Sequence, residues 1–495
     1  MLCLFVLNHT HQEFIDFETR FALFAQDMFR HGVGFFPTIH GKAYPDYLST
    51  STLLIYLSSL PFGEVTKLSA VLPTAIASAL TLMFVYLIGA TVSRRWGFYA
   101  VLMSLMTGLF FASARTISMD QFVVLVTTMS FYFMLRDMRV AWLVLLCMVG
   151  FLFRGAVGFV IPAGVVVSFY FATCQWRRVI FFGLLAGVAL ILCGAVELYL
   201  AYLTDGHDFV QQVLDMQLLN RVSVAVADPW WYYFAHAVGD YAIAFELALM
   251  VVLLSLPILL KHQTNKEHLL LRGLFAWVLI VMLGMSIPQF KHSRYILPIA
   301  PALALLAAYL FAKRKPSRSW FFIKRCMAGV FFIMPTLVTG LLLLFHHRFE
   351  EVSVMYIVVF FIALQILAIG FRKYFEVTAL VVAAICYVVV MISFVEPLTL
   401  QRHAAQSFVQ QVERVRLKTH APLYFYHYTL DGDVIRYLVN VREEVVPSIA
   451  HDLKKLPKNA VVIMPKKTSI PFKNYRVIAR GQFGHRKAVA IYLIQ

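Results

Sequence analysis

A succession of apolar segments, each about 20 residues long, limits what this chain can fold into. They lie near residues 66–92, 97–113, 121–135, 140–153, 157–174, 179–202, 237–260, 272–287, 295–312, 326–345, 353–371 and 377–396. An apolar helix of that length can cross the hydrocarbon core of a bilayer. Hydrophobic residues make up 61% of the chain and charged residues 14%, far from the composition of soluble proteins. The sequence therefore predicts a polytopic α-helical membrane protein.

Basic residues form short clusters at every second junction between these segments. The clusters are Arg94 with Arg95, Arg136 with Arg139, Arg177 with Arg178, Lys261 with Lys266, Lys313 to Arg325, and Arg372 with Lys373. Because positive charge accumulates on the cytoplasmic side, the other junctions face outward. These are residues 9–60, 114–120, the turn around Arg154, 203–236, 288–294 and 346–352. The net charge of +17 is thus explained by topology, and we expect no nucleic-acid partner.

The beginning of the chain is unusual, because Met1 to Leu7 is apolar but too short to cross a bilayer. We expect a first span that is truncated or missing; the alternative is a short re-entrant tip. Counting this stub gives about 13 spans, with the C-terminus outside.

The composition changes to polar and mixed after Glu396 and Pro397. Helical patterns alternate with strand-like runs, which predicts a small outward-facing α/β domain. The expected helices are 404–417 and 449–456, and the expected strands are 423–428, 460–464, 476–480 and 488–494. We therefore divide the chain into a membrane domain, residues 1–396 with a first outer loop at 9–60, and an outer domain, residues 397–495.

The most informative polar island is residues 15–28, at the mouth of the membrane domain. Its apolar residues Phe17, Phe21, Phe24 and Met28 have helical spacing, which predicts an amphipathic helix in the membrane interface. Asp16 precedes this helix. It is either an N-cap that binds free backbone amides or a catalytic acid.

Three further islands carry polar and charged side chains on the outer side. Lys42, Tyr44, Asp46 and Tyr47 precede one apolar segment, Arg115 and Asp120 flank another, and Lys291, Arg294 and Tyr295 precede a third. The bland interpretations are aromatic interface anchors, a salt-bridged helix end and tolerated loop charges. Acids at a span are functional candidates, however, and outward-facing Lys and Arg are well suited to bind phosphate.

The order of these motifs resembles the polyprenyl-phosphate-dependent glycosyltransferases of the C-fold (GT-C) superfamily. The similarity rests on an outer acid-arginine loop, an aromatic loop, an R-x-x-x-x-D junction, an R-G-x-x-G turn, the PWWYY segment and a K-x-x-x-Y-x-L-P-x-x-P motif. Among these enzymes the chain is most similar to the bacterial transferases that add aminoarabinose to lipid A, and more distantly to protein O-mannosyltransferases. The individual motifs are loose, and their order is the specific part.

The resemblance implies roles for residues of the first outer loop. Members carry Asp-Glu-x-Arg-Tyr-Ala, and Glu18 and Arg20 match its Glu and Arg, whereas Phe17 occupies the position of the catalytic aspartate. The acid role then passes to Asp16 or Glu18.

In the next motif, Tyr-Phe-Glu-Lys-Pro-Pro, Tyr44 matches a phosphate-binding tyrosine and Asp46 matches the acid. Tyr47 replaces the lysine, so Lys42 or Lys291 would supply its charge.

Later motifs complete the implied site. Asp120 matches an acid that orients or assists, and Arg154 replaces a lysine of the Lys-Gly-x-x-Gly turn. Lys291 and Tyr295 fit the motif of the donor-phosphate region. The implied donor-phosphate residues are Arg20, Tyr44, Lys291, Tyr295, Arg154 and Lys42. The implied acceptor or cavity residues are Asp46, Tyr47, Arg115 and Arg294.

The resemblance implies an enzyme that moves a sugar from a polyprenyl phosphate to a lipid acceptor such as lipid A, with inversion. Basic and tyrosyl groups would stabilise the departing phosphate, and a carboxylate of Asp16 or Glu18 would prepare the acceptor. The expected location is the bacterial inner membrane, with the active site and the C-terminal domain facing the periplasm. We expect a monomer whose partners are the lipid-linked donor, the lipid or glycolipid acceptor and membrane lipids.

Other functions stay open at this stage. One alternative is protein O-glycosylation with the same donor class; another is a lipid-linked-sugar transporter or flippase; a third is a catalytically silent homologue. The spans hold almost no charged residues, which favours an enzyme over a transporter.

The sequence indicates no cofactor. A divalent metal would need ligands at a characteristic spacing, which the sequence does not show. The residues considered are Asp16, Glu18, Asp46 and the outer histidines His31, His40, His207 and His236. Ordinary loop histidines are therefore the favoured interpretation.

Overall fold

A computed structural model of the chain describes residues 1–9, 12–219, 228–259, 265–313, 316–344, 354–470 and 474–493. The chain forms two compact units. The helical unit contains Met1–Phe5, Asp46–Leu48 and Thr74–Phe394, and the mixed unit contains Val6–Pro45, Ser49–Pro73 and Val395–Gln495. Lys261, residues 220–227 of one outer junction and the junction at 346–352 lie outside the described residues.

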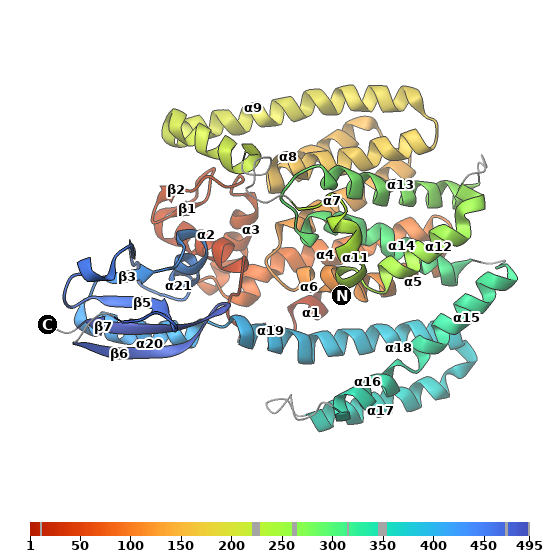
Figure 1. The fold of residues 1–495 in the computed structure, drawn as a ribbon. Coiled ribbons are helices and arrows are strands. Elements are labelled where there is room, and N and C mark those ends of the chain that lie inside the picture. The colour runs from red at the N-terminus through yellow and green to blue at the C-terminus, as the bar shows by residue number, and fades with distance from the viewer. Residues whose placement is uncertain are drawn as a thin grey trace. The chain divides into compact units, whose positions relative to one another are not determined.

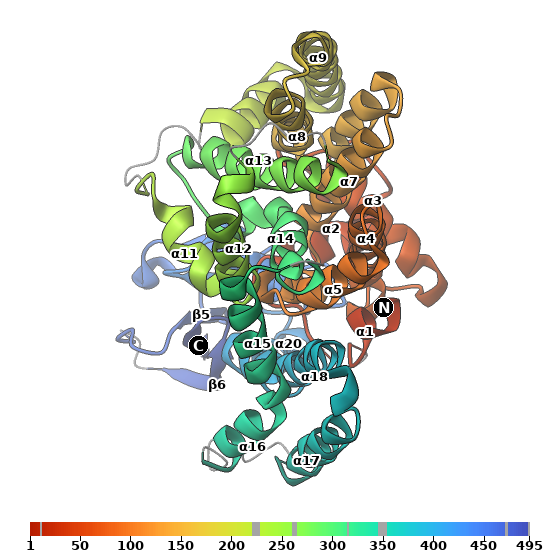
Figure 2. The same cartoon turned by 90° about the vertical axis from the view of Figure 1, so that its right-hand side faces the viewer.

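The helical unit is built from apolar helices (Figures 1 and 2). They are α1 (Leu2–Val6), α4 (Lys67–Ala90, which begins in the mixed unit), α5 (Arg94–Leu105), α6 (Gly108–Ala114), α7 (Met119–Leu135), α8 (Val140–Ala172), α9 (Trp176–Leu214), α11 (Tyr232–Asp240), α12 (Ala244–Leu259), α13 (Lys266–Ser286), α14 (Ala300–Ala312), α15 (Arg318–Phe332), α16 (Met334–Leu344), α17 (Val354–Gly370) and α18 (Phe375–Val390). A 3-10 turn, η3 (Ser293–Ile299), leads into α14.

Among the described residues, six helices are long and apolar enough to cross a membrane, or up to nine if each bent pair is one span. The membrane class is therefore confirmed, whereas the count of 13 spans stays a prediction. Three of the predicted segments each contain two helices joined at a bend. The helix pairs α5 with α6, α11 with α12, and α15 with α16 are bent by 76°, 115° and 45°.

Helix α14 is the core of the helical unit. All residues from Ala300 to Phe311 are buried, and α5, α12 and α13 pack against them. Alanine is frequent in this helix, and small side chains let neighbouring helix backbones approach closely. The indole of Trp96 in α5 donates to the carbonyl of Leu305 at 2.7 Å, which satisfies the polar group of a buried tryptophan.

Helix α8 turns back on itself at Arg154 and Gly155, where the backbone leaves the helical region. Residues eight apart in a straight helix are about 12 Å apart. Here a Cβ on Gly150 would lie 2.1 Å from the carbonyl oxygen of Gly158. Gly155 has φ of +55°, which favours glycine. The two predicted segments on either side of Arg154 are thus confirmed as two limbs joined by this turn.

The mixed unit joins the first outer loop to the C-terminal residues. Its helices are α2 (Glu18–His31), α3 (Thr50–Ser59), α19 (Glu396–His403), α20 (Gln406–Thr419) and α21 (Ile435–Leu438), and its small hairpin is β1 (Thr38–Ile39) with β2 (Lys42–Ala43). The amphipathic helix is confirmed as α2. Its apolar residues Phe21, Phe24 and Met28 are buried within the protein, where α2 packs against α3 and α21, so its place in the membrane interface stays a prediction.

The C-terminal residues form a five-stranded sheet. Its strands are β3 (Leu423–Tyr426), β4 (Ser448–Ala450), β5 (Val461–Pro465), β6 (Tyr475–Phe483) and β7 (Arg486–Leu493), in the order β4-β3-β5-β7-β6. β3 is parallel to β4 and β5, while β7 is antiparallel to β5 and β6. Four strands and helix α20 agree with the prediction. The predicted helix at 449–456 was wrong, since its first residues pair with β3 as strand β4.

Candidate functional site

Arg154 is the centre of a buried cluster in the helical unit. The turn in α8 places its guanidinium 2.9 Å from a carboxylate oxygen of Asp120, at the start of α7. The same guanidinium lies over the rings of Tyr47, at 5.8 Å, and Tyr295, at 5.2 Å. Both charged side chains are under 10% exposed, so the ion pair is largely shielded from water. The structure thus brings together four residues that the sequence had placed in separate islands.

Lys291 lies in the segment that leads to Tyr295. Its ammonium is buried and donates to the carbonyl oxygens of Asp228, at 3.1 Å, and Pro288, at 2.7 Å. Its backbone N–H donates to the Asp228 carboxylate at 2.9 Å. The side chain of Arg294 lies 5.8 Å from the centre of the Tyr295 ring. Asp228, just before the PWWYY segment, is a partner that the sequence did not reveal.

Asp46 lies beside this cluster and is 3% exposed. Its carboxylate accepts a hydrogen bond from the backbone N–H of Tyr47 at 2.9 Å. Gln217 donates to the carbonyl of Asp46 at 3.3 Å and to the carboxylate of Glu197 at 3.0 Å. Glu197, to which the sequence assigns no role, is thus linked to Asp46 through Gln217.

Glu18 occupies a buried position in the mixed unit. Its carboxylate is ion-paired with the ammonium of Lys67, and both side chains are almost fully buried. The backbone N–H of Ile15 donates to the same carboxylate at 3.3 Å. Lys67 is a second residue that the sequence did not reveal, because it begins an apolar helix and resembles an ordinary helix-end charge.

Arg20 and Tyr44, two of the implied phosphate-binding residues, lie close together. The guanidinium of Arg20 is 6.0 Å from the centre of the Tyr44 ring and 5.3 Å from that of Phe21. Lys42 is exposed on the β1–β2 hairpin.

Asp16 does not occupy the N-cap of α2, where Phe17 is found. It adopts a left-handed backbone conformation with φ of +50°, and its carbonyl accepts from the Thr19 hydroxyl at 2.7 Å. Its carboxylate faces two histidines, His403 at 3.2 Å and His485 at 3.0 Å. The N-cap interpretation was therefore wrong, and the histidines were not foreseen.

A second group of acids and histidines surrounds the hairpin turn. Asp27 accepts from the backbone N–H of His40 at 3.0 Å, and its carboxylate lies 3.7 Å from the ring of His31. His40 and His31 contact the carboxylate of Glu444 at 2.8 and 3.2 Å. Hydrogen bonds from His40 and then His31 lower the pKa of Glu444. Two expected outer histidines thus meet acids here, though not the acids that the sequence suggested.

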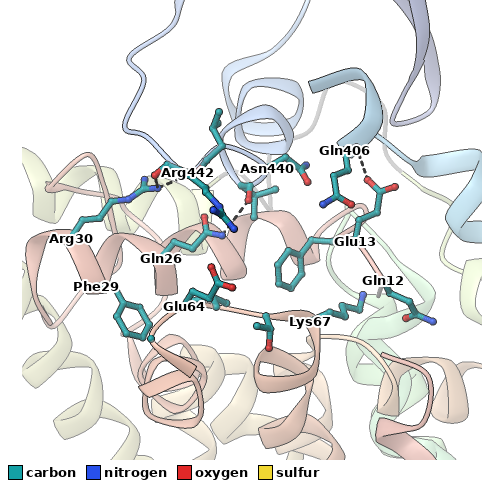
Figure 3. A pocket seen from close by; sticks show the side chains of 16 residues that line it. Gln12, Glu13, Gln26, Phe29, Arg30, Glu64, Lys67, Gln406, Asn440 and Arg442 are labelled. Carbon is teal, nitrogen blue, oxygen red and sulfur yellow. Dashed lines mark hydrogen bonds between the residues drawn. The ribbon is translucent and has the colours of Figure 1, made fainter. Parts of the chain in front are cut away.

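The mixed unit also contains a polar cavity of about 620 Å³ (Figure 3). Helix α2 lines it with Gln26 and Arg30, which donate to carbonyls of the 439–442 segment. Lys67 and the exposed side chains of Glu64 and Arg442 line other parts of the cavity. The space and its charged lining are suited to a polar headgroup rather than to a lipid tail.

Comparisons with known proteins now give the fold a name. The structure of ArnT from Cupriavidus metallidurans bound to undecaprenyl phosphate superposes with a TM-score of 0.72, at 19% identity, over 99% of this chain and 96% of that one. This chain has the GT-C fold. The superposition extends from the membrane helices to the C-terminal sheet, so the predicted fold class is confirmed.

Sequence comparisons agree with this assignment. The family described as dolichyl-phosphate-mannose-protein mannosyltransferase matches residues 51–199. The undecaprenyl phosphate-alpha-4-amino-4-deoxy-L-arabinose arabinosyl transferase of Pseudomonas savastanoi pv. phaseolicola is 25% identical over 60% of this chain. The protein of the same description from Yersinia enterocolitica is 25% identical over 59% of it. The matches span only 57% and 54% of the length of these two relatives.

The predicted site residues of this GT-C chain divide between its two units. Asp46, Tyr47, Asp120, Arg154, Lys291, Arg294 and Tyr295 belong to the helical unit, and Asp16, Glu18, Arg20, Lys42 and Tyr44 belong to the mixed unit. Arg115 is buried in the helical unit and donates to the carbonyl of Leu4 at 2.6 Å. Because Leu4 lies in α1, this hydrogen bond indicates that Arg115 holds α1 against α6.

Proposed function

We propose that this protein transfers a sugar from a polyprenyl-phosphate donor to a lipid acceptor such as lipid A, with inversion at the sugar. It would act as a monomer at the outer face of the bacterial inner membrane, with its C-terminal domain in the periplasm. The observation that supports this function most strongly is the superposition of nearly the whole chain on a GT-C structure that holds undecaprenyl phosphate.

The Arg154 cluster is the proposed site for the donor phosphate. When the sugar leaves, negative charge develops on that phosphate, and fixed cationic and hydroxyl donors stabilise it best where water is excluded. Arg154 is held in place by Asp120 and flanked by Tyr47 and Tyr295, so it needs little reorganisation. Tyr47, which stands where the family has a lysine, would contribute a hydroxyl donor while Arg154 contributes the charge.

The carboxylates would mainly orient the acceptor. Glu18 is ion-paired with Lys67, and Asp120 with Arg154, so each carboxylate is already held in place by a cationic partner. A phosphate oxygen on the acceptor suits this arrangement, since a phosphate monoester is already ionised at neutral pH. The polar cavity beside Lys67 is our candidate for the acceptor's headgroup.

Protein O-glycosylation is the second candidate function. It is favoured by the match of residues 51–199 to a family described by protein mannosyl transfer. A protein acceptor would present a hydroxyl group, which needs a general base, whereas a phosphate acceptor does not.

Transfer by the purified full-length protein tests the proposal. Lipid A and an unstructured Ser/Thr-rich peptide are offered with polyprenyl-phosphate sugars, and mass spectrometry follows the products. We expect mass to be added to lipid A, and Arg154→Met to reduce the rate by about 100-fold or more, the usual effect of removing one such donor. Arg178→Met is the matched control, because that arginine pairs with Asp137 on an exposed surface. Undiminished transfer by Arg154→Met, or transfer to the peptide alone, would contradict the proposal.

A further inference from the structure

Asp16, His403 and His485 form a compact group of nitrogen and oxygen atoms in the mixed unit. One potential ligand atom from each residue lies within 4.8 Å of the other two. The carboxylate of Asp16 is 3.2 Å from Nδ1 of His403 and 3.0 Å from Nε2 of His485. In a tetrahedral zinc site, ligand bonds of about 2.0–2.2 Å separate the ligand atoms by roughly 3.3 Å. Both distances between the carboxylate and an imidazole nitrogen are thus close to that separation.

Hydrogen bonding does not account for this group. Asp16 Oδ1 and His403 Nδ1 are buried, yet neither has hydrogen-bond geometry toward a described residue. The two imidazole rings are 4.2 Å apart and steeply inclined. A buried polar atom without a hydrogen bond costs free energy, and a shared cation would coordinate both of these atoms.

Hydrogen bonds that do not involve the three side chains hold their segments together. The backbone N–H of Gly484 donates to the carbonyl of Ala404 at 3.2 Å, which fixes the β6–β7 turn beside the end of α19. Gln482 donates to the carbonyl of Arg402 at 2.8 Å. On the other side, Glu13 accepts from the backbone N–H groups of Ala405 and Gln406, both at 2.8 Å. The geometry is therefore organised before any ion binds.

The exposure of the group differs among its members. The side chain of His485 is 63% exposed, whereas those of Asp16 and His403 are 30% and 19% exposed. Water can therefore reach the group from the His485 side and complete the coordination of an ion held by three protein ligands. The nearby Arg436 is ion-paired with Asp433, which reduces its repulsion of a cation.

We propose that Asp16, His403 and His485 bind one divalent first-row transition metal ion, with Zn²⁺ as the reference ion. Two imidazole ligands favour such an ion over Mg²⁺ or Ca²⁺, which prefer oxygen ligands, and the carboxylate is also a suitable ligand for Zn²⁺. The ion would tie the segment before α2 to the end of α19 and to the β6–β7 turn. Asp16 would then serve as a metal ligand two residues before Glu18 rather than as a free acid.

Metal binding by the full-length protein in detergent tests this site independently of any transferase activity. The protein is stripped with a chelator and titrated with Zn²⁺ against a competing dye, and with Co²⁺ followed by visible absorption. We expect one ion per chain, and at least about 100-fold weaker binding in Asp16→Asn, His403→Gln and His485→Gln, since even outer-shell changes cost 10- to 100-fold. His420→Gln is the matched control, an exposed histidine of the same unit.

Glu444→Gln distinguishes this site from the other group of acids and histidines, Asp27 with His31 and Glu444. The proposal expects Glu444→Gln to bind the ion like the unchanged protein. It is overturned if the unchanged protein binds no ion, if binding disappears in Glu444→Gln but persists in Asp16→Asn, or if His420→Gln weakens binding equally. Circular dichroism of each variant shows whether it is folded, so that a folding failure is not mistaken for a lost ligand.

Discussion

The buried pair of Glu18 and Lys67 gives a sharp test of how the first outer loop is held. Both side chains are at most 3% exposed. Glu18→Gln leaves a buried ammonium without its counter-charge, and Lys67→Met removes the ammonium from beside a buried carboxylate. Breaking such a pair from one side costs about 3–5 kcal/mol, whereas replacing both partners with neutral groups is often close to neutral. We expect each single variant to be much less stable than the double variant Glu18→Gln/Lys67→Met.

Thermal unfolding of the purified full-length protein measures this difference. For a unit of this size, 1 kcal/mol corresponds to about 2–4 °C, so each single variant should unfold on the order of 10 °C lower. All variants are heated at one scan rate in one detergent, because membrane proteins often unfold irreversibly. Glu64→Gln is the control, since this acid is exposed in the same cavity and its loss should change stability by less than about 0.5 kcal/mol.

The double variant decides between two roles of Glu18. If only the ion pair matters, transfer activity should recover with stability in the double variant; if the carboxylate orients the acceptor, stability recovers while activity stays low. Single variants as stable as Glu64→Gln would refute the reasoning, because a buried charge cannot lose its partner without cost.

Two further predictions concern the α8 turn and the Glu444 contacts. Gly150→Ala should lower the stability by about 1–3 kcal/mol, because the new Cβ would lie 2.1 Å from the carbonyl oxygen of Gly158. Gly164→Ala is the control and should not lower the stability, because the nearest atom to its Cβ would be 3.7 Å away. Thermal unfolding compares the two variants, and equal effects would contradict the close packing at Gly150. The hydrogen bond from His40 lowers the pKa of Glu444 in the folded protein. The ionised Glu444 carboxylate therefore stabilises the fold above the ordinary glutamate pKa of about 4.3, and this stabilisation is lost as the pH falls through the lower pKa of the folded state. Unfolding measured from pH 7 to pH 3 should therefore show that the unchanged protein loses less than about 1 kcal/mol of stability through this contact, and that Glu444→Gln does not show this loss. An identical pH profile in the variant would count against the contact.

Much of the site was predictable where the information lies in local sequence. The position of Arg154 and Gly155 between two apolar segments indicated a turn, and the turn is present. Asp120, Tyr47 and Tyr295 were singled out as polar residues at outer helix ends, and all three contact Arg154. Such residues stand out because a charge or a polar ring at the edge of an apolar span needs a reason.

Partners distant in the sequence were not predictable in the same way. Lys67, Asp228 and His485 have no local pattern that separates them from ordinary surface charges, yet each meets a predicted site residue. Residues 449–456 illustrate the same limit. Their helical pattern yields to strand β4 because β3 offers a partner, and pairing across a sheet outweighs weak local propensity.

The sequence by itself determined the membrane class, the helix and strand segments, and the residue types available for binding phosphate, because apolar length, periodicity and charge placement act between neighbours along the chain. Only the tertiary structure decided which charges are neutralised and which side chains converge. The ion pair of Glu18 with Lys67 and the group of Asp16, His403 and His485 exist because the fold of the mixed unit brings together residues that are far apart in the sequence. Burial then makes each partner indispensable, since an isolated charge away from water is costly.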